Sequence, residues 1–213
     1  MPRRRVLLLL VLYLGLIGGG VAAGRGLTEF AVLDIWPSNE ARVHGMIMTA
    51  TAIYVVSAAV PFVPGAEVGW ALIVTLGPDI VPLVYLSMVG ALLLAFGIGR
   101  LVPARLIAAV FGYVGLARAR DLALHMAPLA PEDRLQLLIA AAPRRVVPFL
   151  LRHRHLALAV AFNVPGNTLV GGGGGLAFVA GMSGLYRFPD YLLTVVLAIA
   201  PVPLLVLVTG SLP

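Results

Sequence analysis

The sequence predicts an all-α integral membrane protein, in which transmembrane helices accompany two opposed re-entrant helical hairpins arranged as an inverted repeat. Three observations predict it: 61% of the 213 residues are hydrophobic and only 11% charged, the mean hydropathy is +1.03, and the apolar residues form long uncharged runs. A spanning helix needs about 20 such residues in succession. This composition effectively rules out a water-soluble globule.

The first run covers residues 6–23 and follows Arg3, Arg4 and Arg5, which predicts a transmembrane helix with a cytoplasmic N-terminus. A basic start, an apolar middle and small residues at 21–23 also fit a cleaved signal peptide, so both interpretations stay open.

The second run, residues 45–78, cannot be one helix, because it contains Pro61, Pro64 and Gly65 within five residues. Proline lacks the amide hydrogen that a helix needs and clashes with the preceding turn. We expect a re-entrant hairpin that bends at Pro64 and Gly65. The third run, residues 80–99, is unbroken and long enough to span a membrane.

Residues 100–155 contain nine arginines and only three acidic residues, which predicts a cytoplasmic segment by the positive-inside rule. Within it, Pro131 followed by Glu132 and Asp133 predicts the start of a helix lying on the membrane surface. Whether residues 101–117 enter the bilayer is left open by their mixture of apolar residues, Pro103 and Arg105.

The fourth run, residues 156–185, is broken at Pro165 and Gly166 and then carries glycine at every position of 171–175. Residues 191–210 form the last predicted span, and the whole chain is one membrane domain.

The order of these runs predicts how the two hairpins are placed. If residues 1–5 and 100–155 are both cytoplasmic, the spans 6–23 and 80–99 supply the two crossings between them. Residues 45–78 then enter and leave from the outer side, and residues 156–185 from the cytoplasmic side. The two hairpins carry the same tripeptide, Val63 to Gly65 and Val164 to Gly166, and we expect the tips to meet near the midplane.

Glu67 is the first candidate for a functional residue, because it is an acid in an otherwise apolar region, where an ionisable group is costly. As a substrate- or proton-binding residue it would titrate during transport. The alternative is that Glu67 only stabilises the free amides at the start of the returning half-helix.

Asn163, Asn167 and Thr168 are candidates for binding a polar headgroup, because amides and hydroxyls donate and accept hydrogen bonds without carrying charge. The alternative is that they satisfy backbone left open by Pro165. Arg187 is a further candidate, for headgroup phosphate, although arginines at span ends are usually interfacial anchors.

Composition also limits the chemistry. With no cysteine and four scattered histidines, we expect no cofactor and no metal site. All 15 basic residues are arginines, which bind phosphate in a two-pronged geometry and suit a protein that contacts lipid headgroups. Because the arginines flank apolar runs, and no basic patch is interleaved with aromatics, we expect no nucleic-acid partner.

Several short motifs resemble those of the DedA/VTT superfamily, also called the SNARE-associated Golgi protein family. They stand at residues 61–67, 97–100, 162–167, 186–188 and 190–193, and the resemblance covers residues 45–210. It implies two opposed re-entrant hairpins, lipid translocation, and for a bacterial member the inner (plasma) membrane.

The chain departs from the pattern of that superfamily at its charged positions. Members carry an acid directly after the first Pro-Gly, an acid in the following span, and arginines on both sides of the second Pro-Gly. Here Glu67 comes one place later, the span position is Leu92, and the arginine positions are Phe162 and Thr168. The resemblance therefore implies only part of a proton-coupled anion site.

These features predict a flippase or scramblase that translocates phospholipid or polyprenyl phosphate without ATP. Membrane lipids are the expected partners, with protons as a second partner if Glu67 titrates. The alternative is a secondary transporter that couples a small solute to protons through Glu67. We expect no enzyme, because no nucleophile and base converge among the apolar runs.

Overall fold

A computed structural model describes residues 10, 11, 14, 15, 18, 19, 22, 40–141, 146–164 and 166–209. Every regular element within them is a helix, which confirms the all-α prediction. Most of the predicted span at residues 6–23 lies outside the described residues, as does Pro165, so what was predicted there stays a prediction.

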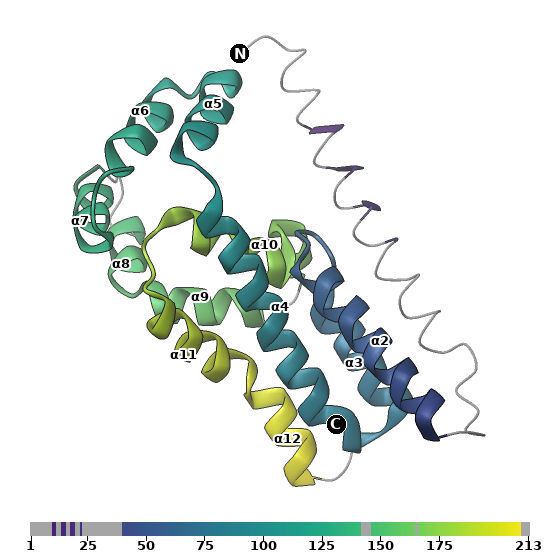
Figure 1. Cartoon of the computed structure of the whole chain (residues 1–213). Helices are drawn as coiled ribbons and strands as arrows, with labels where there is room; N and C mark the ends of the chain where they lie inside the picture. Colours follow the sequence, from purple (N-terminus) through teal and green to yellow (C-terminus); the bar gives the residue numbers. More distant parts are fainter. Residues whose placement is uncertain are drawn as a thin grey trace.

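The helix α4 (Val81–Leu101) runs through the middle of the molecule, with the other helices arranged around it (Figure 1). The short 3-10 turn η1 (Pro78–Ile80) leads into it, and together they form a 24-residue apolar helix over Pro78–Leu101. In the described part of the chain, this is the one single helix long and apolar enough to cross a membrane. It covers the span predicted at residues 80–99.

The first broken run consists of α2 (Glu40–Ala59) and α3 (Gly65–Leu76), which pack against each other and against α4. Residues 60–64 turn between the two helices, so the predicted break at Pro64 is confirmed. Phe62 adopts a φ of 70°, a conformation that L-residues other than glycine rarely take, which makes this turn locally strained.

The second broken run consists of α9 (Arg154–Asn163), the 3-10 turn η2 (Asn167–Val170) and α10 (Gly172–Ser183). The helix α10 makes its most extensive contact with α4. At their crossing, a Cβ on Gly181 would collide with the Phe96 carbonyl oxygen, and a Cβ on Gly99 with the Phe178 carbonyl oxygen. The two glycines therefore permit a backbone approach that no other residue would allow.

The last apolar run, predicted as one span over residues 191–210, is not one continuous helix. The structure has α11 (Phe188–Ile199) and α12 (Pro201–Thr209), which are bent by 41° relative to each other. Pro201 explains the bend, because its ring clashes with the preceding turn and its nitrogen cannot donate a helical hydrogen bond. By length and composition the two helices together fit either one broken span or a re-entrant loop.

The arginine-rich segment forms an arch of four short helices at one end of the molecule (Figure 1). They are α5 (Ala104–Val114), α6 (Ala117–Met126), α7 (Pro131–Ala141) and α8 (Val146–Arg152). The helix α7 begins at Pro131 with two acids in its first turn, as predicted. The helix α5 has 11 residues and is about 16 Å long, too short to cross a bilayer core of about 30 Å.

Candidate functional site

The two breaks lie directly against each other. The Phe62 amide donates a hydrogen bond of 2.7 Å to the Gly171 carbonyl oxygen. A Cβ placed on Gly172 would stand 2.9 Å from the Val63 carbonyl oxygen, and Gly172 itself has a left-handed φ of 67°. The first break thus contacts the start of α10 through backbone atoms, whereas the meeting of the two Val-Pro-Gly tips themselves stays a prediction.

The glycines at residues 171–175 let the backbone of the second run pack closely against the first run. A Cβ on Gly174 would lie 2.6 Å from the Ala58 carbonyl oxygen, near the end of α2, and backbone atoms cannot yield as a flexible side chain can. By contrast, a Cβ on Gly173 would meet only the side-chain ends of Leu92 and Met88, at 3.2 and 3.3 Å. Gly174 is therefore the stricter position for packing the two runs together.

A cavity of about 150 Å³ lies beside this contact and is lined by both broken runs together with α4, α11 and α12. Gly65 and Ala66 of the first run line it, as do Asn163, Asn167 and Gly173 of the second. The volume is enough for a few water molecules and is below the roughly 300–1,000 Å³ of ordinary small-molecule pockets.

Both asparagines of this cavity use their amide nitrogens on backbone carbonyls. Asn163 Nδ2 donates to the Ala159 carbonyl (2.9 Å) and, across to α11, to the Ala198 carbonyl (2.8 Å). Asn167 Nδ2 donates to the Phe162 carbonyl (2.9 Å), one of those that the end of α9 leaves open. These bonds bear out the structural role, and they leave each side chain an acceptor oxygen with which to bind a polar group.

Two tyrosines that the sequence analysis did not single out also line the cavity. The Tyr54 hydroxyl donates to the Gly65 carbonyl at 2.9 Å and so ties α2 to the start of α3. The Tyr85 hydroxyl donates to the Val196 carbonyl at 2.9 Å and ties α4 to α11. The sequence signal was present, since a tyrosine inside an apolar run requires a partner for its hydroxyl.

Glu67, Thr168 and Arg187 do not line this cavity. Glu67 is exposed in the first turn of α3, next to Ala66, where the positive end of the helix favours a carboxylate. The Thr168 hydroxyl is buried in η2 and has no hydrogen-bond partner among the described residues.

Arg187 lies away from the two breaks. Its guanidinium pairs with Glu132 at 2.7 Å and so joins the residue before α11 to the first turn of α7. Both side chains are more than half exposed, so the pair adds little stability. Among the predicted site residues that the structure describes, Gly65, Asn163 and Asn167 line the cavity. Those outside its lining are Pro64, Glu67, Gly166, Thr168 and Arg187.

Leu92, where the family resemblance would lead one to expect an acid, is fully buried in the core. The Tyr191 ring stacks on Phe96 with centroids 3.9 Å apart, and its hydroxyl donates to the Leu92 carbonyl at 3.1 Å. The surroundings of Leu92 are therefore packed aromatic rings and aliphatic side chains.

The polar groups at the meeting of the two breaks are neutral hydroxyls, amides and backbone carbonyls, which suit hydrogen bonding rather than acid-base or covalent chemistry. Within the described ranges, no three histidine, aspartate or glutamate side chains lie close enough together to hold a metal ion. No protein-family model, no curated protein and no solved structure matches this chain.

Proposed function

We propose that this chain is a membrane-embedded flippase or scramblase, which moves phospholipid or polyprenyl phosphate between leaflets without hydrolysing ATP. The observation that carries the proposal is the contact between the two broken apolar runs, made by the bond from Phe62 to Gly171 and flanked by a cavity that both runs line. The apolar length of Pro78–Leu101 supports a membrane location.

Broken helices inside a bilayer are tolerated only where protein or water forms hydrogen bonds with the backbone N–H and C=O groups that the break leaves unpaired. Transporters use such breaks to place polar groups at the midplane. In this proposal the acceptor oxygens of Asn163 and Asn167 replace water around the donor groups of a lipid headgroup, such as an ammonium or a hydroxyl. Amide N–H groups of the nearby backbone donate to the phosphate, while the tails stay in the surrounding lipid. Because the cavity holds only about 150 Å³, the two runs must separate for a headgroup to pass.

An energy source other than ATP is part of the proposal. A phosphate-binding loop of the common type needs a lysine next to its glycines, and this sequence contains no lysine. Movement down a lipid gradient needs no such loop. The proposal includes divergent membership of the DedA/VTT superfamily, a bacterial inner-membrane location, and a cytoplasmic position for residues 100–155.

The test is leaflet exchange in liposomes that contain the purified full-length protein. Head-labelled fluorescent phospholipid and labelled polyprenyl phosphate are the probes, and a membrane-impermeant reductant bleaches whichever probe reaches the outer leaflet. An encapsulated dye reports leakage. Exchange of either probe above the protein-free rate, with the dye retained, supports the proposal. Exchange of both probes at the protein-free rate, or only in liposomes that leak, contradicts it.

A further inference from the structure

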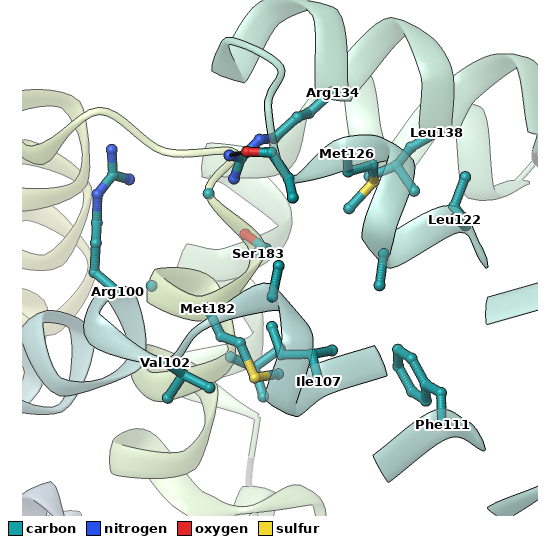
Figure 2. A pocket seen from close by; sticks show the side chains of 16 residues that line it. Arg100, Val102, Ile107, Phe111, Leu122, Met126, Arg134, Leu138, Met182 and Ser183 are labelled. Atoms are coloured by element: carbon teal, nitrogen blue, oxygen red, sulfur yellow. Dashed lines mark hydrogen bonds between the residues drawn. The ribbon is translucent and has the colours of Figure 1, made fainter. Parts of the chain in front are cut away.

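A second and larger cavity lies where the ends of α4 and α10 meet the arch formed by α5, α6 and α7 (Figure 2). Its volume is about 450 Å³, within the roughly 300–1,000 Å³ typical of small-molecule pockets. It shares no lining residue with the cavity at the two breaks. We call it the arch cavity.

Most of the arch cavity is apolar. Its larger apolar side chains come from four helices and are Ile107, Phe111, Leu122, Met126, Leu138 and Met182. Two of these are methionines, whose flexible and polarisable side chains adapt to ligands of different shape. Such a surface fits a hydrocarbon chain better than a fully polar solute.

Two arginines, Arg100 and Arg134, supply the charge of the arch cavity. In the view of Figure 2 both guanidinium groups lie toward one end, with Ile107, Phe111 and Met182 toward the other. Hydrogen bonds to backbone hold them in place. Arg100 Nη1 donates to the Tyr186 carbonyl, while Arg134 Nε and Nη2 donate to the Leu129 and Ala127 carbonyls, each at 2.9 Å.

No acid balances these two charges within the lining, because none of the described residues that line the arch cavity is acidic. Glu132, two residues before Arg134, pairs with Arg187 instead. Partial burial and the positive charge of Arg100 lower the pKa of Arg134, although a guanidinium stays protonated at any physiological pH. Two like charges that line one cavity are stabilised by an anion that contacts both of them.

We infer that the arch cavity binds an anionic amphiphile, with a phosphate headgroup at Arg100 and Arg134 and a hydrocarbon chain along the apolar wall. Arginine binds phosphate through paired hydrogen bonds. A free phosphate would fill only the charged end of the cavity, whereas a hydrocarbon chain would also fill its apolar part. This inference does not rest on lipid transport and concerns a different site.

The test uses the purified full-length protein in neutral detergent, with binding followed by native mass spectrometry. The probe is dioctanoyl phosphatidic acid, and two further arms separate its parts: dioctanoylglycerol has the chains without phosphate, and inorganic phosphate has the headgroup without chains. We expect each part to bind at least about tenfold more weakly than the whole probe, because each makes only half of the contacts.

Matched variants locate the binding. Arg100→Gln and Arg134→Gln remove one charge each, and Arg105→Gln is the control, since Arg105 is an exposed arginine of α5 outside the lining. Ile107→Trp fills the cavity, and Leu106→Trp is its control, because Leu106 is 56% exposed and outside the lining. We expect the cavity variants to lose affinity at least about tenfold and both controls to bind as the wild type does.

Thermal unfolding separates a binding defect from a folding defect. Arg134 also holds the turn between α6 and α7, and Arg100 also bonds to the Tyr186 carbonyl, whereas the Ile107 side chain forms no hydrogen bond. The inference therefore requires affinity loss in Ile107→Trp at an unchanged unfolding midpoint. Equal loss in a variant and its control, equal binding of dioctanoylglycerol, or equal binding of inorganic phosphate would overturn it. Because transport is not measured, failure here leaves the proposed function untouched.

Discussion

The two broken runs share the tripeptide Val-Pro-Gly and differ in how they satisfy the broken backbone. The first turns through two prolines and the strained Phe62, and the Tyr54 hydroxyl holds the Gly65 carbonyl. The second opens its return helix on bare glycine backbone, and asparagine amides cover carbonyls at the end of α9. The shared tripeptide therefore marks only where the chain turns. The residues on either side of it decide whether the turn is held by side chains or packs through glycine backbone.

The largest effect is expected from Gly174→Leu, which places a side chain between the two runs. Its Cβ would lie 2.6 Å from the Ala58 carbonyl oxygen, so the runs must move apart. We expect leaflet exchange to fall to the protein-free rate and the unfolding midpoint to drop. Gly97→Leu is the control, since a Cβ at Gly97 meets nothing within 4 Å. Equal exchange by the two variants would show that the contact is dispensable.

Glu67→Gln tests whether the first run contributes a titratable charge to transport. Glutamine keeps the shape and hydrogen bonding of glutamate but cannot ionise. If transport needs this charge, we expect exchange to fall several-fold. We expect little change in the unfolding midpoint, because the Glu67 side chain is exposed and forms no ion pair among the described residues. Unchanged exchange with an unchanged pH profile would leave Glu67 as a stabiliser of the start of α3.

Asn163→Ala compares the polar ties of the two runs. It removes the bond that links α9 to α11, but because Asn163 is exposed, water bonds to the carbonyls it leaves, so we expect a loss of about 0.5–1 kcal/mol of unfolding free energy. Tyr54→Phe removes a buried bond to the Gly65 carbonyl and should cost more, about 1–3 kcal/mol. Chemical denaturation in detergent measures both. A larger loss for Asn163→Ala would reverse the comparison.

The smallest effect concerns pH and His155, at the start of α9. Burial and the charge of Arg154 lower the pKa of His155, outweighing the opposite influence of Asp190. His155 therefore takes up a proton less readily in the folded state than in the unfolded state. The neutral imidazole thus favours the folded state, and this contribution to the free energy of unfolding is complete above about pH 6.5 and is lost as the pH falls through the folded pKa.

The unfolding midpoint of the wild type should thus fall between pH 7 and pH 5 more than that of His155→Gln. Glutamine can retain a bond to the Thr194 hydroxyl, which lies 2.9 Å from His155 Nδ1. His125→Gln is the control, because His125 is exposed on α6. Parallel pH curves for the wild type and His155→Gln would exclude this residue as the cause.

Proline and glycine made much of the fold predictable, because their effect on the backbone is local. The breaks near Pro64 and after Asn163, and the start of α7 at Pro131, follow from that chemistry. The bend between α11 and α12 carries the same signal in Pro201, but the length of the apolar run concealed it.

The candidate site was less predictable, because it depends on contacts between distant segments. Asn163 and Asn167 could be chosen from sequence, since polar residues at a break need partners. The partners themselves could not, and neither could the pairing of Arg187 with Glu132 or the position of Arg134 beside Arg100. Each of these depends on how the arch folds back over the ends of α4 and α10.

The bond between Phe62 and Gly171 has a consequence for how the protein is made, because its two residues are separated by more than a hundred positions. At a synthesis rate of about 5–20 residues per second, the first break waits roughly 5–20 s for the backbone acceptor that completes it. During that time the Phe62 amide needs another acceptor. Another hydrogen-bond acceptor, such as water, must occupy the place of Gly171 until the second half of the chain emerges from the ribosome.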